Sequence, residues 1–122
     1  MEFYYCSHCK NIIYFFNNKG VPVSCCGEKM SKLTPNTTEG AYDKHIPVIE
    51  KMNDSILVKV GSVPHPMTEE HHIAWIVLET NKGFHKIDLD FTAEPVAEFL
   101  LPKNEYPVTA YEYCNLHGLW KS

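Results

Sequence analysis

Four of the five cysteines lie within the first 26 residues, in a pattern that suits one metal ion. They form a Cys-x-x-Cys turn and an adjacent pair, namely Cys6, Cys9, Cys25 and Cys26. A Cys-x-x-Cys turn presents two sulfur atoms on one side of the chain, and a second pair across a hairpin completes a tetrahedron, in which thiolates favour zinc or iron. Neighbouring side chains leave the backbone in different directions, so the adjacent pair predicts a distorted tetrahedron. His8 lies between two of these ligands and is interpreted as a solvent-facing loop residue.

The main alternative for these cysteines is two disulfides, or one redox-active pair beside incidental thiols. Disulfides are typical of secreted proteins, and the N-terminus lacks the basic segment and apolar stretch of a signal peptide. The total of five cysteines is also odd, which leaves one thiol without a partner. The sequence therefore favours metal ligation.

A second group of candidate ligands is spread over the rest of the chain. It combines histidines in rigid turns or near strand ends with the fifth cysteine: His45, His65, His71, Cys114 and His117. His65 lies between two prolines, which makes its backbone stiff and extended. Cys114-x-x-His117 is followed by Gly118, which suits a tight loop that presents two ligands. Each residue alone is more easily explained as a surface histidine or a buried thiol, but their joint occurrence favours a metal site.

The adjacent histidines His71 and His72 cannot both be ligands if residues 71–78 form a strand, because successive side chains point to opposite faces. Both faces of this segment are apolar, so alternation leaves the choice between them open. His85 lies in another predicted strand without a partner motif, and it is interpreted as structural.

Residues 1–33 are predicted to form a small module with strands at Glu2–Tyr5 and Ile12–Phe16 and a third extended piece at Val21–Ser24. The strands are rich in aromatic and β-branched residues, and a polar turn at residues 17–20 follows them. A module of this size buries little apolar surface, and below about 40 residues a metal or disulfides usually supply the missing stability. The cysteines are therefore expected to hold it together.

Residues 34–122 are predicted to form a larger domain that positions the histidines. In the connector, Asn36 and Glu39 predict a short capped helical turn that Gly40 limits. Beyond it, six strands are predicted at residues 48–51, 56–60, 71–78, 84–90, 96–101 and 108–113. Short strands at this spacing, without a long helix or a repeat, favour an antiparallel sandwich or barrel.

The composition limits the classes of function. A hydrophobic fraction of 44% and a charged fraction of 21% are typical of a soluble globular protein. No apolar run approaches the roughly 20 residues of a membrane helix, and the cytoplasm is the expected location. The formal net charge is −4 without a basic block, which argues against binding to nucleic acid or to an anionic membrane. An enzyme that acts on an anion would therefore need local positive charge at its site.

Four motifs of the larger domain resemble the superoxide reductase family. They are Asp-Lys-His-Ile-Pro-Val-Ile-Glu at 43–50, Gly-Ser-Val-Pro-His-Pro-Met at 61–67, His71-x-x-x-Trp75-Ile76, and Tyr-Cys-Asn-Leu-His-Gly-Leu-Trp at 113–120. The N-terminal cysteines are similar to those of the desulforedoxin module. Together the two parts resemble the two-iron superoxide reductases called desulfoferrodoxins, and the resemblance covers nearly the whole chain.

The resemblance implies an all-β fold and two iron ions per chain. A small desulforedoxin-like metal knuckle domain, residues 1–33, would precede an immunoglobulin-like, seven-stranded β-sandwich, the catalytic domain of residues 34–122, usually in a homodimer. The four cysteines would hold one iron with no open position. The other iron would have four equatorial imidazoles and one axial thiolate, from His45, His65, His71, His117 and Cys114. The family ligand falls at His71 rather than at His72.

The chain departs from the family pattern at two positions. Lys10 follows the Cys-x-x-Cys turn where the family commonly has glycine, which predicts slight strain but removes no ligand. Asp43 stands where the family commonly has a glutamate that caps the oxidised iron, and its side chain is one methylene shorter.

The activity implied is reduction of superoxide by one electron and two protons to hydrogen peroxide, with a rubredoxin-like protein as electron donor. Lys44 would attract the anion and order a water that delivers protons, although the residues alone favour a solvated surface lysine. Backbone N–H groups of the Leu116–His117 turn are expected to hydrogen-bond the Cys114 sulfur and moderate its donation to the metal.

Two other functions are compatible with the residues. The chain could be a rubredoxin-like electron carrier whose second metal site is not catalytic, which predicts no reaction with superoxide. It could also be a structural zinc protein, which predicts a colourless preparation. Superoxide dismutation is expected to be weak, because a thiolate-ligated iron that has been oxidised by superoxide should resist re-reduction by a second superoxide.

Overall fold

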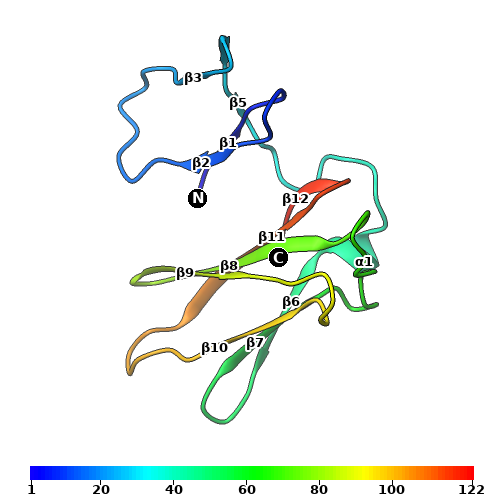
Figure 1. The fold of residues 1–122 in the computed structure, drawn as a ribbon. Coiled ribbons are helices and arrows are strands. Elements are labelled where there is room, and N and C mark those ends of the chain that lie inside the picture. Colours follow the sequence, from blue (N-terminus) through cyan, green and yellow to red (C-terminus); the bar gives the residue numbers. More distant parts are fainter. The chain divides into compact units, whose positions relative to one another are not determined.

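The computed structural model describes all 122 residues, which divide into two compact units, Met1–Thr34 and Pro35–Ser122 (Figure 1). Its only helix, α1 (Tyr42–His45), has four residues, and no helix is long and apolar enough to cross a membrane. The rest of the regular structure is strand, as the sequence predicts. Each unit is described by itself.

The first unit is built from five very short strands. β1 (Phe3–Tyr5) lies between β2 (Ile12–Tyr14) and β5 (Ser31–Lys32), and β3 (Ser24–Cys25) pairs with β4 (Glu28–Lys29) in a separate hairpin. The extended piece predicted at Val21–Ser24 enters a strand only at its last residue. β4 and β5 were not predicted, because their polar residues carry no apolar alternation and only backbone pairing makes them strands.

The second unit has seven strands in two antiparallel sheets, which agrees with the predicted sandwich. One sheet has the order β10 (Val96–Phe99), β7 (Ile56–Val60), β6 (Pro47–Lys51). The other has the order β12 (Gly118–Lys121), β11 (Pro107–Cys114), β8 (Ile73–Thr80), β9 (Gly83–Asp88). Inward-facing apolar side chains of β7, β8, β10 and β11 form one buried core between the sheets.

The helical turn predicted at Asn36–Glu39 is wrong. Asn36 has φ +62°, outside the right-handed helical region, and its side chain pairs with the backbone of Lys121 instead of capping a helix. Helix α1 begins six residues later. β12 was not predicted as a strand, because Gly118 marks a tight turn in the sequence while the strand that it begins is recognised only by its pairing with β11.

Candidate metal centres

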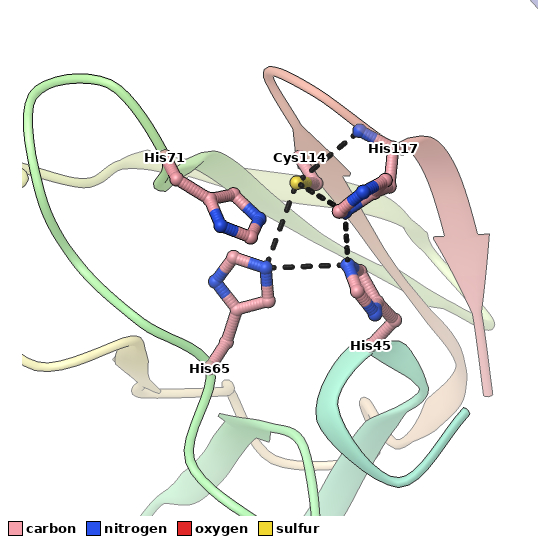
Figure 2. A group of neighbouring side chains, drawn as sticks. All are labelled: His45, His65, His71, Cys114 and His117. Atoms are coloured by element: carbon pink, nitrogen blue, oxygen red, sulfur yellow. Dashed lines mark hydrogen bonds between the residues drawn. The ribbon is translucent and has the colours of Figure 1, made fainter. Parts of the chain in front are cut away.

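The five candidate ligands of the second unit converge on one point. Their ligand atoms all lie within 4.8 Å of one another. Helix α1, the proline-flanked loop after β7, the segment before β8 and the β11–β12 turn supply them in order: His45, His65, His71, and Cys114 with His117. Figure 2 shows the four imidazole rings turned edge to face around the Cys114 sulfur.

The spacing of the nitrogen atoms fits a bound ion. Nε2 of His45 lies 3.1 Å from Nδ1 of His117 and 3.2 Å from Nε2 of His65. Metal–imidazole bonds of about 2.1 Å at right angles would place neighbouring nitrogens about 3 Å apart. His71 adds the same indication, because its Nε2 atom is buried and has no hydrogen-bond partner. A cation would satisfy these converging lone pairs.

Backbone carbonyls fix the orientation of two rings. Nδ1 of His45 is 2.8 Å from the carbonyl oxygen of Ala41, and Nδ1 of His65 is 2.6 Å from that of Pro66. A proton on each Nδ1 donates to these oxygens and leaves the Nε2 lone pair directed inward, as in most protein metal sites.

Burial favours the neutral, metal-binding form of three of the imidazoles, those of His45, His65 and His71. It lowers the pKa of His45 and His71, and it lowers the pKa of His65 to about 4, because the charged ring loses water. Each ring also disfavours a charge on its neighbours. Protons therefore compete weakly with a metal for these nitrogens at neutral pH.

Cys114 is fully buried, and burial raises the pKa of its thiol. Backbone N–H groups of Leu116 and His117 oppose this rise, and the His117 N–H group lies 3.4 Å from Sγ. The expected hydrogen bonding of this sulfur by the turn is thus present. A bound cation would complete the stabilisation of the thiolate.

Asp43 and Lys44 precede His45 in α1, and both side chains are exposed. Their charges reach the centre, since Lys44 lowers the pKa of His45 and Asp43 raises it. The structure thus places the proposed anion-attracting lysine within electrostatic range of a ligand.

His72 and His85 lie outside this group of ligands. His71 and His72 precede β8, which begins at Ile73, so the prediction that they lie in a strand is wrong and alternation does not separate them. His72 turns Nδ1 to the carbonyl of Thr68, whereas His71 points to the other ligands. His85 has a partner that the sequence did not reveal, with Nε2 2.8 Å from a carboxylate oxygen of Glu105.

The four cysteines of the first unit also form one cluster. Their sulfur atoms lie within 4.8 Å of one another, and none is in a disulfide. Hydrogen bonds from the backbone of residues 9 and 8 help to lower the pKa of Cys6 to about 6. Hydrogen bonds with the sulfur atoms of Cys9 and Cys6 raise the pKa of Cys26 to about 12. One thiol in this cluster is thus easily ionised while another resists, and a cation bound by all four would relieve the crowding of charge.

Left-handed backbone conformations shape both knuckles of this cluster. Lys10 has φ +69°, a conformation that glycine adopts most easily, and it stands where the family commonly has glycine. Its ammonium group donates to the carbonyl of Ser7 at 2.7 Å across the knuckle. Cys26 has φ +53°, which redirects the chain between the adjacent cysteines. His8 is exposed as expected and pairs with Glu28 at 3.1 Å.

Three residues near the second centre were not predicted from the sequence to act there. Trp120 is fully buried, stacks on the His45 ring at 4.7 Å and donates from Nε1 to the carbonyl of His117. Gly40 lies against both rings, since a Cβ there would be 3.1 Å from atoms of His45 and Trp120. Glu112 is fully buried in β11, and a negative charge on it would raise the pKa of the Cys114 thiol. Two of them carried a signal: Trp120 ends the 113–120 motif, and Glu112 is a charged residue on the same face of the strand as Ala110.

Comparison with known proteins gives one family for the whole chain. Residues 37–122 match the family model for desulfoferrodoxin. A desulfoferrodoxin of Syntrophotalea carbinolica is 46% identical over 100% of this chain and 95% of its own length, and one of Nitratidesulfovibrio vulgaris is 45% identical over 99% and 94%. The crystal structure of the superoxide reductase from Treponema pallidum superposes with a TM-score of 0.83 at 37% identity, covering 98% of both chains. The chain therefore belongs to the desulfoferrodoxin family.

Proposed function

We propose that the protein is a superoxide reductase that converts superoxide, one electron and two protons to hydrogen peroxide at the centre formed by His45, His65, His71, Cys114 and His117. The observation that carries this proposal is the convergence of four imidazoles and one buried thiol on a single point. Five donors exceed the four of a closed tetrahedral zinc site, which favours iron over structural zinc. An iron(II) ion held by these residues would supply the electron.

The residues of the chain control charge and protons around the ion. Neutral imidazoles add no negative charge, and the His117 N–H group tempers the basicity of the Cys114 thiolate. Lys44 supplies the positive charge that a chain of net charge −4 needs to attract a small anion. Its ammonium group orders a water that passes protons to the reduced substrate. Asp43, beside it, has a carboxylate that can approach the centre from the same turn.

The first unit has an accessory role in this proposal. It is a desulforedoxin-like domain whose four cysteines hold a second iron and thereby stabilise a module with little core of its own. The family resemblance supports a rubredoxin-like protein as the electron donor and a homodimer.

A comparison of two lysine variants tests the function. Reduced, iron-loaded protein is mixed with superoxide generated by pulse radiolysis, at several ionic strengths. Lys44→Ala is expected to slow the bimolecular step by about tenfold at low salt and to flatten its dependence on salt. Lys103→Ala, an exposed lysine in the β10–β11 loop, is the matched control and should leave the rate unchanged.

Each alternative has its own signature in this experiment. A wild-type protein that does not react with superoxide would refute the proposed activity and support an electron carrier. A colourless preparation that contains zinc would support a structural zinc protein. An unchanged rate for Lys44→Ala at low salt would refute the role of Lys44 while leaving the activity intact.

A further inference from the structure

Two segments meet beside the centre through a single carbonyl oxygen. The backbone oxygen of Asp43, in α1, accepts a hydrogen bond from the N–H group of Val63 at 2.9 Å. The hydroxyl of Ser62 donates to the same oxygen at 3.2 Å. The N–H group of Gly61 donates to the carbonyl of Val63 at 3.2 Å, which closes the turn. Residues 61–63, called here the 61–63 turn, thus hold the peptide that joins Asp43 to Lys44 by two hydrogen bonds.

The hydrogen bonds from Val63 and Ser62 replace one that the helix cannot make. In an α-helix the carbonyl of residue 43 accepts from the N–H group of residue 47. That residue is Pro47, which has no N–H group. The carbonyl of Tyr42, one residue earlier, is satisfied within the turn by Ile46 at 2.9 Å. The Asp43 carbonyl therefore depends on donors from another segment.

The close approach requires glycine at position 61. A Cβ on Gly61 would lie 2.6 Å from the Asp43 oxygen and 3.0 Å from the Ile46 oxygen. Both atoms belong to the backbone, so no side-chain rotation can relieve the overlap. The φ angle of Gly61 is not positive, and the requirement is therefore one of space and not of conformation.

We propose that the 61–63 turn positions Lys44, and that Gly61 and Ser62 are positioning residues for the attraction of the anionic substrate, an inference that rests on the proposed function. The same segment continues into His65, whose N–H group donates to the carbonyl of Val60 at 2.9 Å. The turn thus ties the Lys44 peptide to a loop that carries a ligand. The side chain of Lys44 is exposed and flexible. Fixing its Cα atom therefore restricts the region that its ammonium group can reach.

The proposal is tested with Gly61→Ala and Ser62→Ala, each alone and combined with Lys44→Ala. With Lys44 present, Gly61→Ala is expected to slow the superoxide reaction by about tenfold and to flatten its dependence on ionic strength. Ser62→Ala removes one of two donors and is expected to slow it about twofold. Ser62→Thr keeps the hydroxyl and should restore the rate, while Ser31→Ala, an exposed serine of β5, is the matched control.

The combined variants separate positioning from general damage. If the turn acts through Lys44, neither substitution slows the reaction further in the Lys44→Ala protein. Effects that multiply independently in the double variants would overturn the proposal. If Gly61→Ala does not fold, the comparison of Ser62→Ala with the Ser62→Ala, Lys44→Ala double variant is sufficient to test the proposal.

A second readout does not depend on activity. Amide hydrogen exchange at Val63 is measured in the zinc-loaded chain. Protection of this amide should fall in Gly61→Ala, and adding Lys44→Ala to that variant should not restore it. Unchanged protection together with an unchanged salt dependence would overturn the role of the turn. If Val63 loses protection in Gly61→Ala but the wild-type chain does not react with superoxide, the proposed function alone is refuted.

Discussion

Glu112 gives the most direct test of the electrostatics inside the second unit. It lies in the central strand β11, opposite Ile76 of β8 and Trp120 of β12, and it is fully buried. Neither of its carboxylate oxygens has a hydrogen-bond partner. Burial accordingly raises the pKa of this carboxyl from its ordinary value of 4.5 to about 9. In the folded chain at neutral pH the group is an uncharged acid.

The consequence for stability has a definite sign. The unfolded chain loses the Glu112 proton above its ordinary pKa of 4.5, whereas the folded chain keeps it until the pH approaches about 9. In this window the folded state binds more protons, so the free energy of unfolding falls as the pH rises. Each pKa unit corresponds to about 1.4 kcal/mol, and between about pH 5 and about pH 8 the loss from this group is about 4 kcal/mol.

Replacing Glu112 by glutamine removes the titration and nearly preserves the shape. The amide N–H group that it buries costs roughly 1–3 kcal/mol at every pH, which gives a constant offset. The variant should therefore gain stability relative to wild type by about 4 kcal/mol between about pH 5 and about pH 8. Glu98→Gln, at an exposed position of β10, is the control and should show no such trend.

Chemical denaturation followed by far-ultraviolet circular dichroism measures the difference, with wild type and variants in the same metal-loaded state. Protonation of the metal ligands changes all three proteins alike and cancels in the comparison. A stability difference between Glu112→Gln and wild type that stays constant across this pH range would refute the neutral, unpartnered carboxyl. A difference of the opposite slope would mean that Glu112 is paired as an anion.

Three further substitutions address other parts of the structure. Gly40→Ala should reduce the iron content of the second unit and destabilise the chain by roughly 1–3 kcal/mol, because the new Cβ would lie 3.1 Å from atoms of His45 and Trp120 and push their rings aside. Metal quantitation and thermal melting check this. Glu105→Gln should be less stable than wild type at neutral pH, and the difference should vanish in acid, because the bonds from Thr80 and His85 lower the pKa of Glu105 and their stabilisation is lost as the pH falls through that value. Denaturation at several pH values measures it. Cys26→Ser should remove the iron and the visible thiolate band of the first unit while the second unit keeps its iron, as elemental analysis would show.

The candidate ligands were predictable from the sequence because their signals are local. A Cys-x-x-Cys turn, a histidine between two prolines and a Cys-x-x-His turn each restrict the backbone within a few residues. Short strands at regular spacing similarly predicted six of the seven strands of the second unit, although not β12. The position of His71 before β8 could not be predicted from the sequence. The first residue of a strand is set by its pairing, and here Ile73 pairs with Cys114.

The features that the sequence did not reveal depend on contacts between distant segments. Asn36 resembles a helix cap in sequence, yet its amide pairs with Lys121, 85 residues away. The 61–63 turn lies within a family motif, but its own residues do not reveal why position 61 needs glycine, since that need arises from the Asp43 carbonyl. Likewise, the place of Glu112 inside the sheet, between β8 and β12, is set by strand pairing and not by its own sequence.

The two centres differ most in the charge that they give to a bound iron(II). Four neutral imidazoles and one thiolate leave the ion with net positive charge, and Lys44 adds to the field on that side. Four thiolates around the same ion give a net negative charge, which repels an anionic substrate. The neutral state of Glu112 matters for the same reason, because its ionisation would place a second negative charge near Cys114. With iron(II) in both centres, attraction of superoxide to the second and its repulsion from the first would follow from the donors that each unit supplies.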